Sequence, residues 1–207
     1  MSDKEIVLVG YSGHAFVLAE AASSSGMNLK HYTEKKESLK NPFNLNYLGY
    51  EGDEDFKGWD FNYGFILGIG DNVIRTRVAR LIKSRGAELI NVIHKQASIS
   101  SNVKLGKGVF IARNAAVNPL SDIQDYTIIN TGSIIEHECT IGSGSHIGPG
   151  AVLAGNVKVG ANCFIGANAV IKQGVTIGDN VIVGAGSVVI RDLGNNKKVV
   201  GNPSREL

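Results

Sequence analysis

The sequence predicts a small α/β domain over residues 1–93, followed by a three-sided parallel β-solenoid over residues 94–207. Two observations support this fold class. The first part of the chain contains two units in which an apolar strand runs through a glycine turn into a helix. The second part repeats a branched aliphatic residue at every sixth position, sixteen times from Ile99 to Val189. A short, fixed period is typical of solenoids, in which each repeat packs on its neighbours.

The composition excludes several other classes of protein. Of the 207 residues, 26 are glycine and only four are proline, and the formal net charge is +2. Such a small charge indicates neither nucleic-acid binding nor attraction to an anionic membrane. No apolar run reaches membrane-spanning length, and the N-terminus lacks the pattern of a signal peptide. Because the two cysteines form no disulfide framework, we expect a cytoplasmic protein that does not insert into membranes.

The first domain follows a strand–turn–helix pattern that occurs twice. The expected elements are a strand at 5–9, a turn at 10–14, a helix at 15–22, a strand at 29–33, a strand with its glycine turn at 65–72 and a helix at 73–83. This order is typical of a small Rossmann-like, nucleotide-binding domain. Backbone N–H groups at the start of the first helix, near Gly10 and Gly13, would suit a phosphate. A purely structural turn explains these two glycines equally well.

The six-residue repeat divides into inward, outward and corner positions. Two residues before each branched aliphatic stands a small residue, so both point to the same, inward side of a short strand. Three residues after each aliphatic, twelve of sixteen positions are Gly or Asn, which best tolerate the positive φ of a tight corner. The four exceptions are Leu120, Tyr126, Glu138 and Asp192. Each repeat is therefore expected to be a short strand followed by a corner.

A period of six does not by itself give the number of sides, but the outward strand residues support three. Sorted in steps of 18, these residues separate into two apolar sets and one polar set. The apolar sets are Phe110, Ile128, His146, Phe164 and Ile182, and Ala116, Ile134, Val152, Val170 and Val188. The polar set is Lys104, Asp122, Thr140, Lys158 and Thr176. Two adjacent apolar faces on an outer surface predict burial against other copies in a cyclic homotrimer.

His137 and Glu138 are the candidate catalytic residues. His137 lies two positions after an inward aliphatic, on an outward corner between the second apolar face and the polar face. In a trimer this edge would line the crevice between subunits, where a neutral imidazole could act as a general base. Glu138 occupies a corner position that favours Gly or Asn, and local rules are often broken at functional sites. Its carboxylate could hydrogen-bond the imidazole, and a merely tolerated corner residue is the alternative.

The remaining histidines and cysteines carry weaker signals. His146 is the one polar member of an apolar face, and we expect it to contact a ligand rather than only fill an interface. Cys139 and Cys163 both belong to the small inward set, so neither is expected to act as a nucleophile or a metal ligand. No metal-ligand spacing occurs, and no metal cofactor is expected.

Several segments resemble a known family. The hexapeptide steps and the tail Val199–Arg205 resemble the hexapeptide acyltransferases, whose solenoid is a left-handed parallel β-helix. The turns Tyr11–His14 and Gly68–Asn72, together with Asn130–Cys139, narrow the resemblance to bacterial nucleotide-sugar N-acetyltransferases. Within this group, the segments resemble in particular the UDP-4-amino-sugar acetyltransferases of bacillosamine synthesis. The sialic-acid-type O-acetyltransferases are more distant relatives.

The resemblance implies a role for individual residues. It makes His137 the general base and Glu138 its activator. The residues that it assigns to the nucleotide-sugar are Ser12, Gly13, His14 and Gly70. Relatives carry acidic residues after the second strand, where this chain departs from the pattern, and we expect Glu34 to take their place. Asn130 is also expected to bind the substrate. The residues that it assigns to acetyl-CoA are His146, Ala167 and Ala185.

We therefore expect an acetyl-CoA-dependent N-acetyltransferase that acts on the 4-amino group of a nucleotide-linked deoxy amino sugar. The resemblance favours a UDP-sugar and a place in the synthesis of surface glycans or glycoproteins. One alternative is a sugar O-acetyltransferase with the same base, which kinetics with amine and hydroxyl acceptors would separate. Another is a non-catalytic, sugar-binding solenoid, which a thioester-cleavage assay would identify.

Overall fold

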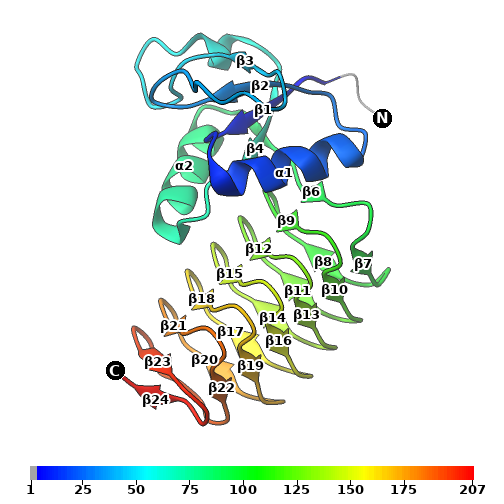
Figure 1. The fold of residues 1–207 in the computed structure, drawn as a ribbon, viewed down its shortest axis with the longest axis vertical. Helices are drawn as coiled ribbons and strands as arrows, with labels where there is room; N and C mark the ends of the chain where they lie inside the picture. The colour runs from blue at the N-terminus through cyan, green and yellow to red at the C-terminus, as the bar shows by residue number, and fades with distance from the viewer. Residues whose placement is uncertain (1–3) are drawn as a thin grey trace.

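The computed structural model describes residues 4–207 and shows an α/β domain seated on one end of a long solenoid (Figure 1). The first domain contains β1 (Ile6–Val9), α1 (Gly13–Ser24), β2 (Leu29–Thr33), β3 (Asn46–Tyr47), the 3-10 helix η1 (Lys57–Asp60), β4 (Gly64–Leu67), α2 (Asn72–Ser84) and β5 (Glu88–Leu89). Its parallel sheet has the order β3-β2-β1-β4-β5. Both expected strand–turn–helix units are confirmed. The short strands β3 and β5, with two residues each, were not predicted.

The two helices cover opposite faces of this sheet because side chains alternate along β1. Ile6 and Leu8 pack in one apolar cluster with residues of α1. Val7 and Val9 pack in a second cluster with residues of α2. None of the helices within residues 4–207 is long and apolar enough to cross a membrane.

The solenoid is three-sided, as the 18-residue sorting predicted. Its strands are β6 (Val92–Ile93), β7 (Ser98–Ile99), β8 (Lys104–Leu105), β9 (Phe110–Ile111), β10 (Ala116–Val117), β11 (Asp122–Ile123), β12 (Ile128–Ile129), β13 (Ile134–Ile135), β14 (Thr140–Ile141), β15 (His146–Ile147), β16 (Val152–Leu153), β17 (Lys158–Val159), β18 (Phe164–Ile165), β19 (Val170–Ile171), β20 (Thr176–Ile177), β21 (Ile182–Val183), β22 (Val188–Val189), β23 (Lys198–Val200) and β24 (Arg205–Glu206). Each strand from β6 to β19 pairs in parallel with the third strand after it, so that three sheets form. At the end of the chain, β21 pairs in parallel with β23, and β23 pairs antiparallel with β24. The first solenoid strand is therefore β6, which lies just ahead of the boundary expected after residue 93.

The corners adopt the backbone conformation that the Gly and Asn pattern predicts. Fourteen of the sixteen corner positions have positive φ, and Asn102 and Asp192 are the two that do not. Glu138 has a φ of 61°, a conformation that costs free energy for a residue with a Cβ. The inward aliphatic and small residues form one continuous buried core along the solenoid.

The α/β domain covers part of one outer face of the solenoid. Phe110 and Ile128 are buried in the same apolar cluster as α1, and His146 is buried next to them. Phe164 and Ile182 of the same face remain partly exposed. The expectation that another copy covers this whole face was thus wrong for the part formed by Phe110, Ile128 and His146, because the chain's own first domain already covers these residues.

Candidate active site

The His137–Glu138 pair forms at the edge of the solenoid between β13 and β14. The Nδ1 atom of His137 lies 3.0 Å from Oε2 of Glu138, and both side chains are about half exposed. In the neutral imidazole, Nδ1–H then donates to the carboxylate and Nε2 is left free to accept a proton. The predicted hydrogen bond within the pair is confirmed. An exposed Nε2 with this orientation suits a general base.

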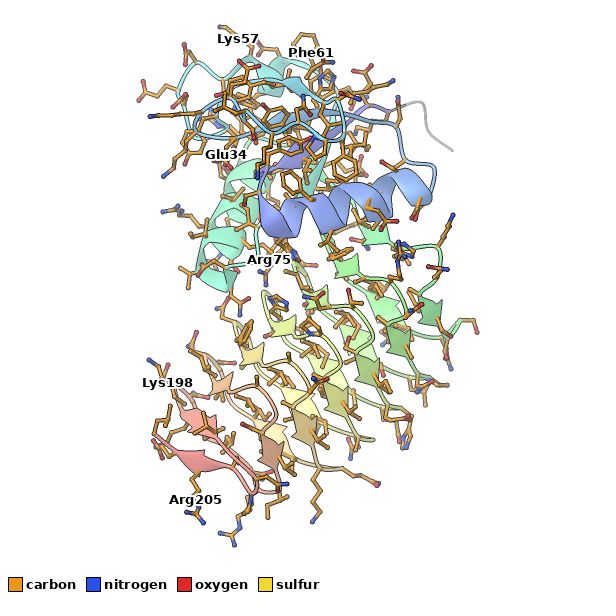
Figure 2. The ribbon with its side chains drawn as sticks, in the orientation of Figure 1. Glu34, Lys57, Phe61, Arg75, Lys198 and Arg205 are labelled. Carbon is orange, nitrogen blue, oxygen red and sulfur yellow. The ribbon has the colours of Figure 1, made fainter. Side chains whose placement is uncertain are left out.

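A second group of candidate residues lines a cavity in the α/β domain. This cavity has a volume of about 260 Å³ and lies where β1, β2 and β4 end. The predicted substrate-binding residues Ser12, His14, Glu34 and Gly70 all line it, and Figure 2 shows Glu34 at this end of the sheet. The carboxyl ends of parallel strands on either side of a change in strand order are the usual ligand site of such sheets. The structure therefore brings these four residues together as expected.

The two glycines of the first turn differ in their structural role. Gly10 has a φ of +83°, which requires glycine. A Cβ on Gly13 would meet no atom within 4 Å, so a side chain there would not crowd the turn itself. Gly13 is the first residue of α1, where backbone N–H groups have no partner in the helix. A side chain at this position is therefore compatible with the fold.

Beneath the cavity, His14 and His146 lie side by side between the domain and the solenoid. Their ring centroids are 5.9 Å apart. The side-chain amide of Asn130 donates to Nε2 of His146 at 2.9 Å, and Nδ1 of His146 faces the Gly70 carbonyl at 3.4 Å. Burial, with a smaller contribution from nearby Arg75, lowers the pKa of both His14 and His146 to about 4. Both imidazoles are therefore neutral at pH 7.

The other expected acetyl-CoA contacts lie on a different edge of the solenoid. Ala167 and Ala185 stand one coil apart between the sheets of β18 and β19, and the N–H of Gly186 donates to the Ala167 carbonyl. Ala185 is exposed and Ala167 is half-buried, so both border the exposed part of the face that contains Phe164. Their role in binding acetyl-CoA stays a prediction.

Comparisons with known proteins match the whole chain. Residues 5–82 match the PglD N-terminal domain, residues 121–155 the bacterial transferase hexapeptide (six repeats), and residues 156–191 the hexapeptide repeat of succinyl-transferase. Perosamine N-acetyltransferase from Caulobacter crescentus, solved with CoA and GDP-perosamine, is 33% identical. That alignment covers 100% of this chain and 98% of the other, with a TM-score of 0.94. This chain belongs to the hexapeptide-repeat nucleotide-sugar N-acetyltransferases.

Two further solved structures have the same fold as this chain over almost its whole length. The acetyltransferase domain of PglB from Neisseria gonorrhoeae, in complex with acetyl coenzyme A, is 26% identical over 100% of both chains, with a TM-score of 0.93. WeeI from Acinetobacter baumannii, at 24% identity, covers 99% of this chain and 100% of its own, with a TM-score of 0.88. The solenoid of this N-acetyltransferase is thus the left-handed parallel β-helix that the resemblance implied.

Both cysteines of this N-acetyltransferase are free and buried. Burial raises the pKa of Cys139, and burial raises that of Cys163 to about 11. Their thiols donate to the carbonyls of Ala154 and Gly178. Neither is a thiolate nucleophile at neutral pH. Within residues 4–207, no three His, Cys, Asp or Glu side chains gather as metal ligands would.

Gly155 is a site residue that sequence reasoning missed. It lies 18 residues after His137, one coil further along the same edge. A Cβ at this position would come within 2.5 Å of Nε2 of His137, so only glycine leaves room for the imidazole. The 18-residue period of the coils could have identified Gly155, because it occupies the same outward corner position as His137 in the next coil.

We expect Gly155→Ala to lower kcat of the N-acetyltransferase by roughly tenfold to a hundredfold, since the methyl group displaces the base from its position. Steady-state kinetics measures this, with circular dichroism to confirm the fold. Ser101→Ala, on the same edge but two coils before His137, is the matched control and should keep wild-type kcat. A Gly155→Ala variant with unchanged kcat would show that the position of the imidazole does not matter.

Proposed function

We propose that this N-acetyltransferase transfers the acetyl group of acetyl-CoA to the 4-amino group of a nucleotide-linked deoxy amino sugar. The observation that carries the proposal is the His137–Glu138 pair, whose free Nε2 is poised to accept a proton. The neutral amine attacks the thioester carbonyl, His137 accepts the ammonium proton, and the CoA sulfur leaves. Because Cys139 and Cys163 are buried, direct transfer is favoured over an acyl-enzyme.

The choice of acceptor distinguishes N-acetylation from O-acetylation and from a solenoid without catalytic activity. Release of free CoA thiol is measured with matched 4-amino and 4-hydroxy nucleotide-sugars. Release with the amine alone supports the proposal, and release with the hydroxyl alone identifies an O-acetyltransferase. No release with any acceptor identifies a non-catalytic solenoid. Two free, buried cysteines also fit the reducing cytoplasm, which is the compartment we propose.

We propose a homotrimer because one copy cannot form the complete site. His137 stands on the edge between the sheets of β13 and β14, whereas His146 lies in the third sheet, in β15. In a three-sided solenoid that edge is opposite the third sheet. The catalytic pair of one copy and the nucleotide-sugar cavity of the same copy therefore open on different sides. A neighbouring copy in a cyclic trimer supplies the missing half of each site.

The trimer predicts an effect for a charge on the exposed part of the apolar face. Phe164→Asp should dissociate the assembly into monomers, because assembly would bury an unpaired carboxylate. Thr176→Asp places the same charge on the polar face and should leave the trimer intact. Light scattering at micromolar protein measures both. A monomeric wild type would contradict the assembly.

The cavity contains two carboxylates that bear on the choice of nucleotide. Glu34 accepts backbone N–H bonds from Tyr11 and Lys35, and the buried Glu51 accepts from the Thr33 hydroxyl at 2.7 Å. Burial raises the pKa of Glu51, so its carboxylate gains from any additional donor that a ligand offers. Guanine presents neighbouring N–H donors that suit a carboxylate. Uracil has a single N–H between two carbonyl oxygens, and a carboxylate would repel both of these oxygens. We therefore propose a GDP-linked acceptor in place of the UDP-sugar that the sequence favoured, in keeping with the perosamine enzyme.

Calorimetric titration tests the nucleotide directly. GDP should bind about tenfold or more tightly than UDP, and Glu51→Gln should reduce this preference, since a hydrogen bond to a charged group is lost. Glu54→Gln, with an exposed side chain in the same loop, is the control. Tighter binding of UDP would restore the original expectation of a uridine nucleotide.

A further inference from the structure

Arg75 is the largest fully buried side chain of the protein, and it is charged. It lies on the first turns of α2, where this helix meets the solenoid (Figure 2). Burial lowers its pKa to about 10, so it still carries its charge at neutral pH. Burying a guanidinium is expensive unless its hydrogen bonds are satisfied.

All acceptors of Arg75 are neutral oxygen atoms. Five are backbone carbonyls and one is a side-chain amide, at 2.7–3.4 Å: Ile69, Gly70, Tyr126, Gly144, Ser145 and Asn72. The first two carbonyls belong to the glycine turn that lines the nucleotide-sugar cavity. The carbonyls of Tyr126, Gly144 and Ser145 belong to the same edge of the solenoid in two consecutive coils. The Arg75 side chain thus joins this glycine turn, Gly68–Asn72, to the solenoid, and we call the turn the substrate loop.

The hydrogen bonds of Arg75 continue into the site. The Gly70 carbonyl accepts from Arg75 at 2.9 Å and also faces Nδ1 of His146. On the other side of the ring, the side-chain amide nitrogen of Asn130 donates to Nε2 of His146, and the side-chain oxygen Oδ1 of Asn130 accepts from the backbone N–H of Thr131. This arrangement selects the His146 tautomer that is protonated on Nδ1.

The charge of Arg75 acts on the same histidines. It disfavours protonation of both His14 and His146, and within residues 4–207 the only other titratable group that lowers the pKa of His146 is His14. An apolar residue of similar size would avoid the cost of burying a charge. The observed arrangement is therefore better explained by placement of the site than by stability.

We propose that Arg75 is a positioning residue for acetyl transfer, which fixes the substrate loop on the solenoid and holds His146 in its neutral, Nδ1-protonated form. This inference rests on the proposed function for its kinetic consequences. Its structural consequence, the state of the His146 ring, is independent of any activity.

The test compares Arg75→Met, Arg75→Lys and the control Arg80→Met, an exposed arginine on the same helix. Nitrogen NMR of the imidazoles reports tautomer and titration. In Arg75→Met, His146 should lose its single tautomer and protonate at a higher pH than in the wild type. In Arg75→Lys the charge remains, so the titration should stay close to that of the wild type. Arg80→Met should match the wild type in every measurement.

Kinetics supplies the second readout. Both Arg75 variants should raise the acceptor KM about tenfold, because bonds from a charged donor to the loop are lost. An unchanged His146 spectrum in folded Arg75→Met overturns the inference. If Arg75→Met does not fold, Arg75→Lys decides: a raised acceptor KM supports the positioning role and a wild-type KM overturns it. A wild type that acetylates no nucleotide-linked amine refutes the proposed function alone, since the NMR result stands without it.

Discussion

Replacing His137 by alanine is expected to lower kcat about a hundredfold or more, the usual consequence of losing a general base. The reason is geometric, because Nε2 of His137 is the free nitrogen of a ring whose other nitrogen is held by Glu138 at 3.0 Å. Steady-state kinetics with saturating acetyl-CoA and acceptor measures the effect. The dissociation constant of acetyl-CoA should barely change, since the half-exposed imidazole is not needed to bind the thioester.

Glu138 provides the internal comparison. Glu138→Gln should lower kcat by roughly tenfold, less than the loss of the base, because the amide no longer stabilises the protonated imidazole. The double variant should be no slower than His137→Ala, since the two side chains act as one unit. Near-wild-type turnover of His137→Ala at neutral pH would refute the mechanism.

Mixing two inactive variants is expected to restore activity. His137→Ala lacks the base, and Gly13→Val places a side chain at the start of α1, where the structure leaves open space for it and a ligand would collide with it. If each site combines the pair of one copy with the cavity of another, random mixed trimers regain about a quarter of wild-type activity. Co-expression of the two chains, followed by assay at limiting acceptor, measures this recovery.

The matched control for this experiment is a mixture of two variants that both lack the base, His137→Ala and His137→Gln. Every site in that mixture lacks a base, so no activity should return. Activity in the first mixture that never exceeds the sum of the two separate proteins would mean that each copy contains a complete site.

Much of the fold follows from local sequence pattern. The six-residue period, the inward columns and the corners with positive φ each depend on a few neighbouring residues, so they are visible in one sequence. The same register placed His137 outward and Glu138 at a strained corner, and hence predicted their hydrogen bond. The first domain could be predicted equally well from the sequence, since β1 with α1 and β4 with α2 each form a contiguous strand–turn–helix unit.

What the sequence did not reveal depends on contacts between distant segments. Arg75 belongs to a helix with several charged residues, so it resembles any solvent-exposed arginine until the solenoid corners are placed against it. Glu51 lies in a loop that no periodicity organises, and its burial becomes visible only beside Thr33. The coverage of Phe110, Ile128 and His146 by the first domain likewise depends on how the two parts pack.

This protein is expected to acetylate the amino group of a nucleotide-linked sugar. The most direct test incubates the purified protein with acetyl-CoA and a GDP-linked 4-amino-4,6-dideoxy sugar, then analyses the product by mass spectrometry and NMR. We expect a mass gain of one acetyl group, an amide at the sugar C4 position, and no product with His137→Ala. Acetyl groups found only on hydroxyl oxygens, or no acetylated product with GDP-, UDP- and dTDP-linked amines alike, would contradict this expectation.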